Sequence, residues 1–190
     1  MKKVFIAAAV CLAWVVGCYA DEMAMMKAMV QSVNLSDIRA YGKDALVKKN
    51  PLKTDKFVFN TYFLAPRQVL GLHKHETSDE LFYVVEGNGQ LTVGNDQIMA
   101  SAGTAVYGPA NVPHGIVNSG NDNMMVISVQ APTPVKIEAL NNSSMICSVC
   151  GQEDIIPAGA KEGDTYECPR CHAKFKLYKT AEGKWAGTKI

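Results

Sequence analysis

Strong net charge is absent from this 190-residue sequence, whose formal charge at neutral pH is only +1. A chain so close to neutrality has no overall electrostatic attraction toward nucleic acid, so we expect no nucleic-acid partner. Long hydrophobic runs are also lacking. The most prominent uncharged apolar stretch, residues 4–16, is shorter than the ~20 residues that a membrane-spanning helix needs, so we expect no permanent transmembrane anchor there.

This N-terminal stretch instead has the layout of an export signal, because two lysines precede the apolar run and small residues follow it. Two processing routes remain open. Residues 15–18 resemble the box of bacterial lipoproteins, which would place a lipid anchor on Cys18, and residues 18–20 also fit an ordinary cleavage site. We therefore predict a signal peptide over residues 1–20 and an exported protein that is periplasmic or membrane-anchored facing the periplasm.

Segments with a long helical period are missing, and no internal repeat is present. From residue 56 onward the sequence forms short runs rich in β-branched and aromatic residues, separated by turns that contain glycine, asparagine or proline. Strands are predicted at residues 57–64, 69–75, 81–85, 90–93, 97–100, 104–107, 114–117 and 124–129. The pattern predicts an all-β fold with a single sandwich or jelly-roll barrel over residues 56–135.

The segments on either side of the predicted barrel are expected to be less regular. Residues 21–55 are interpreted as a lead-in with a short helix at residues 23–29, where four methionines lie among good helix formers. These methionines could hold copper(I), but packing of the helix on the barrel is the favoured interpretation. Residues 136–146 are predicted to be a linker, and residues 147–190 a metal-binding tail.

Histidine is scarce, but three of the four histidines and one glutamate are spaced so that they can meet inside the barrel. His73 and His75 are two residues apart on a predicted strand, so their side chains point to the same face. Glu80 begins the next strand after a polar turn, and His114 lies on a distant strand. Such a set suits one divalent Fe, Mn, Ni, Cu or Zn ion and leaves positions open for substrate. Burying the four groups without a cation would be unfavourable, because each would need its own polar partners.

The order and spacing of these residues resemble the two motifs of the cupin family. The first motif runs glycine, five residues, His-x-His, three or four residues, glutamate, six residues, glycine; the sequence follows it with Arg67 at the first glycine. The second runs glycine, five residues, Pro-x-Gly, two residues, histidine, three residues, asparagine; the sequence follows it to Asn118, with Asn111 at the second glycine. Asparagine tolerates a left-handed backbone, so Asn111 can keep its turn, whereas Arg67 is expected to alter the lip of the barrel.

The resemblance covers residues 57–132 and implies a jelly-roll barrel that holds a metal on His73, His75, Glu80 and His114. The superfamily includes dioxygenases, decarboxylases, sugar-phosphate isomerases and non-catalytic binders, and fold alone cannot choose among them. We expect a small-molecule ligand or substrate. If the protein is an enzyme, a mononuclear metal oxygenase or a related lyase or isomerase is expected, and a binding or sensor module is the alternative. A homodimer through the barrel is a further expectation.

Strand parity predicts what surrounds this site. Phe82 and Val84 share the face of Glu80, and Ile116 and Asn118 share the face of His114, which predicts a mostly apolar pocket. No second acid or base is evident inside the two motifs. The candidates for proton transfer are three tyrosines, for which a place in the core or at the rim is the simpler interpretation: Tyr62, Tyr83 and Tyr107.

Four of the six cysteines lie in the tail as two Cys-x-x-Cys pairs, Cys147 with Cys150 and Cys168 with Cys171, with seventeen residues between the pairs. The spacing is typical of a four-cysteine zinc site, and the region resembles a zinc ribbon, with rubredoxin-type iron as the alternative. Because so short a tail cannot bury a sufficient core, metal is expected to supply its folding energy. Two alternatives stay open: c-type haem on Cys168, Cys171 and His172, which would make the tail a redox module, and disulfides.

Overall fold

The computed structural model describes residues 31–141 and 143–190. The predicted signal peptide over residues 1–20 and the short helix predicted at residues 23–29 lie outside these residues. Within them the regular structure consists of strands alone, which confirms the predicted all-β class.

The chain divides after residue 34 into two units. Of the first unit only residues 31–34 are described, and they have no regular structure. The second unit, residues 35–190, carries every strand of the described chain. A search of the described residues finds no helix long and apolar enough to cross a membrane.

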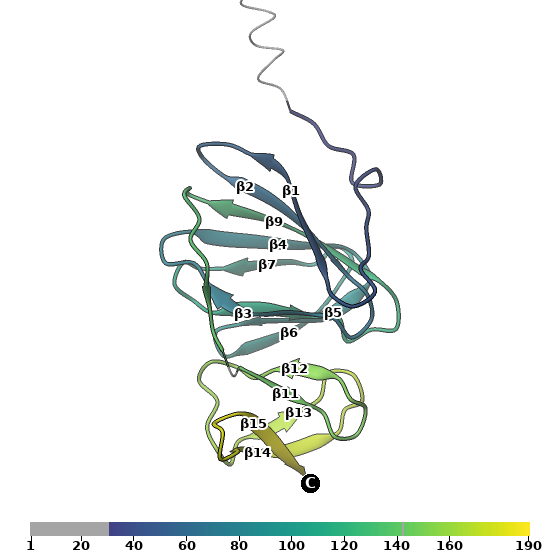
Figure 1. Ribbon diagram of the computed structural model, residues 1–190, viewed down its shortest axis with the longest axis vertical. Coiled ribbons are helices and arrows are strands. Elements are labelled where there is room, and N and C mark those ends of the chain that lie inside the picture. The colour runs from purple at the N-terminus through teal and green to yellow at the C-terminus, as the bar shows by residue number, and fades with distance from the viewer. Residues whose placement is uncertain (1–30, 142) are drawn as a thin grey trace, which may run out of the picture. The chain divides into compact units, whose positions relative to one another are not determined.

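Two five-stranded antiparallel sheets form the barrel (Figure 1). The first has the order β1-β2-β9-β4-β7, with bounds Val47–Lys53, Val58–Leu64, Met124–Ala131, Asp79–Glu86 and Ala105–Gly108. The second has the order β10-β3-β8-β5-β6, with bounds Glu138–Ala139, Val69–Lys74, His114–Val117, Asn88–Val93 and Asp96–Ser101. Strands distant in sequence are neighbours in both sheets, because the chain crosses repeatedly from one sheet to the other, as in a jelly roll.

Every strand predicted from the sequence is present, with ends shifted by at most two residues. Two strands of the barrel were not expected. β1 lies in the segment interpreted as a lead-in, and β10 lies in the predicted linker, so the barrel extends beyond residues 56–135 on both sides. β1 is an edge strand of sequence Val-Lys-Lys-Asn-Pro-Leu-Lys, with an irregular register between Lys49 and Leu52. Proline and lysine are tolerated at edges, but they hide the apolar alternation by which strands are recognised.

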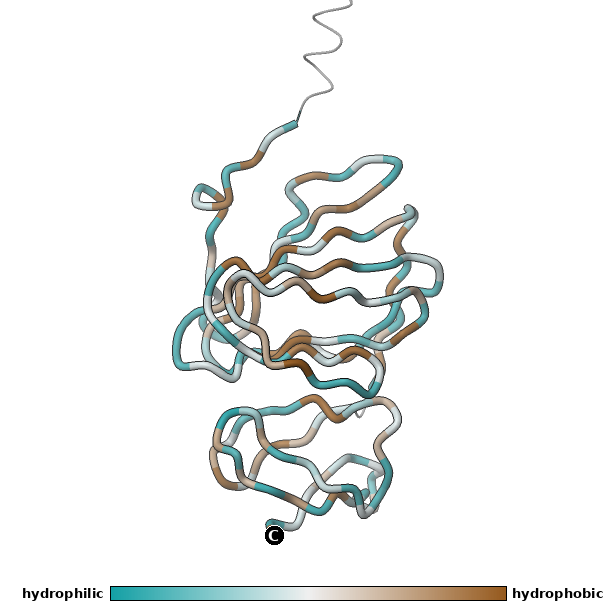
Figure 2. The backbone as a smooth tube through the Cα atoms, turned by 180° about the vertical axis from the view of Figure 1, so that it is seen from behind, coloured by the Kyte–Doolittle hydropathy of each residue, from teal (hydrophilic) through white to brown (hydrophobic). Residues whose placement is uncertain are grey.

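The apolar core of the barrel lies between the two sheets. Inward-facing positions alternate with outward-facing ones along each strand, and Figure 2 shows hydrophobic stretches within the strands and hydrophilic ones mostly in the connecting loops. The buried members of this core are Tyr62, Leu64, Phe82, Val84, Leu91, Ala100, Val106, Ile116, Met124 and Val126. No residue of the tail belongs to this core.

The tail consists of two small antiparallel sheets. β11 (Ser144–Ile146) pairs with β12 (Glu153–Ile155), and β13 (Thr165–Glu167), β14 (Lys174–Lys179) and β15 (Trp185–Lys189) follow in that order. The tail therefore begins before residue 147, inside the predicted linker. Its buried cluster contains two of the cysteines besides apolar side chains: Met145, Cys147, Ile156, Tyr166, Cys168, Phe175 and Leu177.

The tail packs against the second sheet of the barrel. Ile155 shares a buried cluster with Leu72 on β3 and Val117 on β8. Gly115 on β8 gives it room, because a Cβ there would lie 2.6 Å from Ile155 Cδ1 and 2.8 Å from a backbone oxygen. Arg170 donates from its guanidinium to the carbonyl of Gly120 at 2.6 Å. The outer surface of the two strands that carry His73 and His114 is therefore covered by the tail.

Candidate metal centres

The structure brings the four predicted barrel ligands together between the two sheets. His73 on β3 lies directly opposite His114 on β8, His75 follows β3, and Glu80 lies on β4 of the other sheet. All four are buried, and one donor atom from each lies within 4.8 Å of the others. The predicted convergence of these side chains is present in the structure, and metal binding by them stays a prediction.

Each histidine of this group is oriented by a backbone carbonyl. The Nδ1 atoms lie at hydrogen-bond distance from carbonyl oxygens as follows: His73 from Gly71 at 2.9 Å, His75 from Lys136 at 2.9 Å and His114 from Val112 at 3.0 Å. A carbonyl oxygen only accepts, so each Nδ1 carries a hydrogen, and in a neutral ring Nε2 is then the atom left to bind a metal. Partners of this kind orient the imidazoles of metal sites.

The spacing of the donor atoms fits a shared divalent ion. Nε2 of His75 and Nε2 of His114 each lie 3.0 Å from Oε2 of Glu80, and Nε2 of His73 lies 4.0 Å from it. Two donors about 2.1 Å from one ion at a right angle would be about 3.0 Å apart. Nε2 of His114 is also buried, and apart from its approach to Glu80 it has no hydrogen-bond partner among the described residues; a bound cation would satisfy it.

The protonation states of this group suit a metal ion as well. Burial opposes ionisation of Glu80, but four polar neighbours outweigh it and hold the pKa of this carboxyl well below its usual range: His114, His75, Ser128 and Gln130. Burial lowers the pKa of the His73 imidazole to about 4. At neutral pH the carboxylate is therefore ionised and His73 is neutral, as metal ligands must be.

Polar side chains adjoin Glu80 on the inner face of the first sheet. Gln130 on β9 lies directly opposite Glu80, so the two side chains share a face, and Gln130 Nε2 lies 2.9 Å from His75 Nε2. Tyr62 is fully buried, and its hydroxyl donates to Oε1 of Glu80 at 3.2 Å. Of the three tyrosines considered for proton transfer, Tyr62 is therefore beside the site, whereas Tyr83 and Tyr107 are 42% and 56% exposed.

Lys48, like Gln130 and Ser128, is a residue near the site that the sequence did not predict. It lies on β1 directly opposite Tyr62, and its Nζ lies 5.3 Å from the centroid of the Tyr62 ring. Lys48 is exposed as a residue, yet desolvation by neighbouring atoms lowers the pKa of its ammonium, against the opposing charge of Glu80. Lys48 could have been found from the sequence only by predicting β1. The polar composition of that strand concealed it.

The surroundings of the site are less apolar than the sequence predicts. Phe82, Val84 and Ile116 are at most 1% exposed, so they fill the core instead of lining an open pocket. Asn118 is buried too, and its Nδ2 donates to the carbonyls of Leu64 and Asp122 at 2.9 Å each. Its side chain therefore holds the segments at Leu64 and Asp122 together instead of lining a pocket. Open space next to the site is found instead along β1 and the segment that follows β9.

The two residues that replace motif glycines both adopt the left-handed backbone of a glycine. The φ angle is 74° at Arg67 and 60° at Asn111. The carbonyl of Arg67 accepts a hydrogen bond from Nε2 of Gln152 in the tail at 3.3 Å. Arg67 thus lies where the tail meets the barrel, and neither replacement displaces a predicted ligand.

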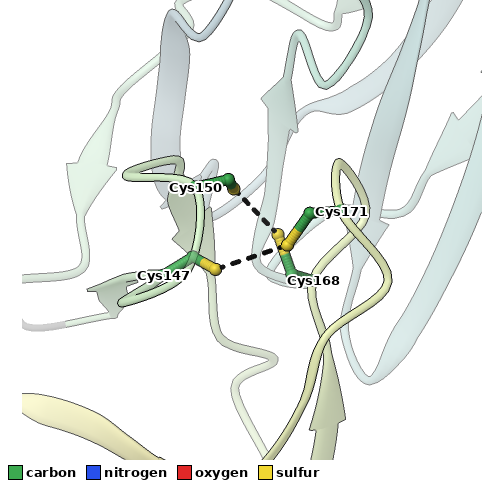
Figure 3. Close-up of side chains that lie close together, drawn as sticks. All are labelled: Cys147, Cys150, Cys168 and Cys171. Atoms are coloured by element: carbon green, nitrogen blue, oxygen red, sulfur yellow. Dashed lines mark hydrogen bonds between the residues drawn. The ribbon is translucent and has the colours of Figure 1, made fainter.

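The four cysteines of the tail form the second candidate centre (Figure 3). Their sulfur atoms gather in one group, with 3.7 Å between Cys147 and Cys171 and 3.7 Å between Cys150 and Cys168. All four are free, at separations far longer than a disulfide bond. Sulfurs about 2.3 Å from one tetrahedral ion would lie about 3.8 Å apart, so the group fits zinc or iron.

The backbone around the two cysteine pairs follows the same pattern twice. The N–H of Gly151 donates to the carbonyl of Cys147 at 2.8 Å, and the N–H of His172 donates to the carbonyl of Cys168 at 2.9 Å. Gly151 and His172 both have a positive φ, of 72° and 59°. The imidazole of His172 is exposed and lies 3.0 Å from a carboxylate oxygen of Glu167. The two turns therefore present their sulfurs alike, as in a zinc-ribbon-like tail.

Comparison with known proteins agrees with the geometry. Residues 60–130 match the family model described as the Cupin domain. The chain contains a cupin domain. The tail lies outside the matched residues, so the comparison with this family concerns the barrel alone.

Relatives of the cupin domain are partial matches. An uncharacterized protein of Methanocaldococcus jannaschii is 38% identical over 61 residues, which cover 32% of this chain and 49% of that protein. The match thus spans about half the length of this relative. A protein of Thermotoga maritima named oxalate-binding protein is 27% identical over 84 residues, which cover 44% of this chain and 69% of that protein.

Solved structures share the cupin fold. A Thermus thermophilus protein has a TM-score of 0.53 and 28% identity, covering 55% of this chain and all of that one. A Klebsiella pneumoniae protein described as having a double-stranded β-helix domain has a TM-score of 0.56 and 19% identity, covering 59% of this chain and 98% of that one. The second likeness, at this low identity, shows the fold alone.

Proposed function

We propose that this protein is a metal-dependent cupin that binds a small anionic molecule at one divalent ion held by His73, His75, Glu80 and His114. The observation that carries the proposal is the orientation of the three imidazoles, whose Nδ1 atoms are held by carbonyls while their Nε2 atoms converge on a buried carboxylate. A divalent transition metal would supply Lewis acidity and open positions for the ligand.

The net charge of the proposed metal site and the similarity to a named relative both support an anionic ligand. Three neutral imidazoles, one carboxylate and a divalent ion together carry a net charge of +1 in a buried setting, where an anion is attracted and a cation repelled. The Thermotoga maritima relative is named for binding oxalate, a small organic acid. We therefore propose a small organic acid anion as the ligand class, and binding is the function that the geometry supports first.

Metal analysis of the purified protein tests this function. Glu80→Ala should lose the barrel metal and keep the tail metal, because the two candidate centres share no ligand. The matched control is Glu76→Ala, which removes an exposed carboxylate from the turn before β4 and should lose neither metal. Loss of both metals or of neither in Glu80→Ala would contradict the two-site proposal. Oxygen uptake or release of carbon dioxide with a panel of small acids would then separate an enzyme from a binder.

For the tail we propose a structural zinc or iron ion on the four cysteines. Haem attachment would use only Cys168 and Cys171, whereas the sulfurs of both pairs gather in one group. His172, which would have to ligate the haem iron, faces Glu167. A visible spectrum with a haem band would overturn the proposal, and a colourless protein with one tail zinc would support it.

We also propose that the chain is exported, on the layout of its N-terminal residues alone. The mass of the mature protein recovered from its own host decides the route. Cleavage near residue 20 without lipid indicates a soluble periplasmic protein, and a diacylated Cys18 indicates a membrane anchor. A full-length chain in the cytoplasm would overturn the proposal.

A homodimer through the barrel is proposed from the outer face of the first sheet. Val129, Leu81 and Tyr107 lie side by side across β9, β4 and β7, and all three are exposed. An exposed apolar row of this kind marks an association surface. Leu81→Lys should convert a dimer into a monomer in light scattering, and a monomeric parent protein would remove the proposal.

A further inference from the structure

We propose that Lys48 anchors a second anionic group of the bound molecule, so that the ligand of the metal site is a small dicarboxylate. This inference rests on the proposed metal-dependent function and names the ligand class within it. It assigns a binding role to a residue that lies outside both sequence motifs, on the edge strand β1.

The register of the first sheet places Lys48 on the same face as Tyr62. Lys48 and Tyr62 are direct cross-strand partners, and such partners project from the same face of a sheet. Tyr62 is fully buried in the barrel core, and its hydroxyl reaches Glu80. The side chain of Lys48 follows that face, because its Nζ lies 5.3 Å from the Tyr62 ring. One tyrosine side chain therefore separates the ammonium from the ligand carboxylate.

Open space adjoins Lys48 on two sides. A cavity of about 390 Å³ has Lys48, His73 and Ile137 in its lining, and a cavity of about 260 Å³ has Lys48, Ile137 and Gln130. Volumes of this size suit small molecules. Lys48 lies at the border of both cavities, next to one predicted metal ligand and to the amide that contacts another. A molecule in the larger cavity would therefore border both this ammonium and His73.

The ammonium of Lys48 has no protein anion committed to it. It forms no ion pair or hydrogen bond within residues 31–141 and 143–190, and its contact there is the Tyr62 ring. Its neighbour Lys49 differs, since Lys49 Nζ donates to the carbonyl of Ile38 at 2.8 Å. Once Glu80 ligates a cation, its negative charge is shared with that cation. The charge of Lys48 is then left for a ligand.

Charge balance selects a dianion over a monoanion. The proposed ion with Glu80 and three neutral imidazoles carries +1, and Lys48 raises the local charge to +2. A monocarboxylate bound to the metal would leave the ammonium unpaired, whereas the second carboxylate of oxalate or malonate would pair with it. Charge-assisted hydrogen bonds of this kind are the strong ones.

Titration calorimetry on the full-length, metal-loaded protein tests the inference, with oxalate and malonate as dicarboxylate probes and acetate as the monocarboxylate probe. Lys48→Met should weaken dicarboxylate binding by about tenfold or more, because it removes a charged partner. Acetate binding should change less than threefold, and the metal content should be unchanged. Lys49→Met, which removes the same charge from the next residue of the strand, should behave like the parent protein.

The outcomes separate this inference from the function on which it rests. A parent protein without barrel metal contradicts the proposed function itself. A parent protein that holds the metal but binds neither dicarboxylate, or a Lys48→Met variant that weakens oxalate and acetate equally or not at all, overturns the role of Lys48 alone. Lys48→Arg keeps the charge and should retain the dicarboxylate preference within threefold. Loss of that preference in a folded Lys48→Arg variant would assign Lys48 a structural role.

Discussion

The barrel and the tail differ in where their candidate metal ligands lie with respect to the buried apolar cluster of each region. In the barrel, the four buried ligands lie beside ten buried apolar residues that pack against one another. In the tail, Cys147 and Cys168 are themselves members of the small buried cluster. We therefore expect a metal to contribute more to the folding of the tail, whose small core includes two of the ligands, than to the folding of the barrel, which has a larger apolar core.

Loss of the tail metal should give the largest effect. Cys168→Ser should unfold the tail, because structural zinc supplies roughly 10–16 kcal/mol of folding free energy in small zinc modules. Amide exchange should show residues 144–190 unprotected and the barrel strands still protected. The control is Glu80→Ala, which should leave the tail protected. A protected tail in Cys168→Ser would remove the contrast between the two regions.

Docking of the tail on the barrel gives the next effect. Ile155→Ala removes a fully buried side chain from the cluster with Leu72 and Val117, which should destabilise the protein by about 2–5 kcal/mol. Thermal unfolding should then split into two transitions, because the regions lose their shared packing. Ile146→Ala, at an exposed position in the neighbouring strand, should leave a single transition. A single unshifted transition in Ile155→Ala would show that Ile155 does not couple the two regions.

Acid should destabilise the metal-free barrel. A histidine in the unfolded chain has a pKa of about 6.5, whereas burial lowers the pKa of His73 to about 4. Between these values the unfolded state binds the proton and the folded state does not. The free energy of unfolding should therefore fall by roughly 2–3 kcal/mol as the pH falls from 6.5 to 4. Glu80 adds an effect of the same sign, because its pKa is also lowered.

Chemical denaturation of the metal-free protein across this pH range measures the effect. His73→Gln removes the titrating group and should therefore reduce the change in the free energy of unfolding between pH 6.5 and 4. A stability that rises on acidification of the parent protein would contradict the assigned protonation states.

The smallest effect is expected from the hydroxyl that contacts Glu80. Tyr62→Phe removes the donor at 3.2 Å from Oε1, which should weaken metal binding by about tenfold and lower stability by about 1 kcal/mol. The matched control is Tyr107→Phe, whose hydroxyl is on the exposed face and should leave metal affinity unchanged. Equal metal affinity in both variants would remove Tyr62 from the site.

The sequence predicts the ligands of both regions better than what surrounds them. His73 and His75 could be placed on one face because strand parity is local, and the cysteine spacing is likewise local. β1 escaped prediction because Lys48, Lys49 and Pro51 give it no apolar alternation, and Lys48 was missed with it. The prediction of an apolar pocket beside Glu80 was wrong for another reason. Strand parity gives the face on which Phe82 lies, but it does not tell whether neighbouring side chains fill the space in front of that face.

Contacts between the two regions had no sequence signal at all. The hydrogen bond from Gln152 to the carbonyl of Arg67 and the fit of Ile155 over Gly115 join segments far apart in the chain. Neither side of these contacts follows a period or a motif. Their geometry depends on how two separately folded sheets meet, which local patterns do not encode.

Anomalous diffraction from a crystal of the metal-loaded protein, recorded at the absorption edge of the barrel metal, tests the central claim most directly. We expect one peak inside the barrel, about 2.0–2.2 Å from Nε2 of three histidines and from one carboxylate oxygen: His73, His75, His114 and Glu80. A barrel without a peak, or a peak elsewhere with these four side chains bound only to one another, would contradict it.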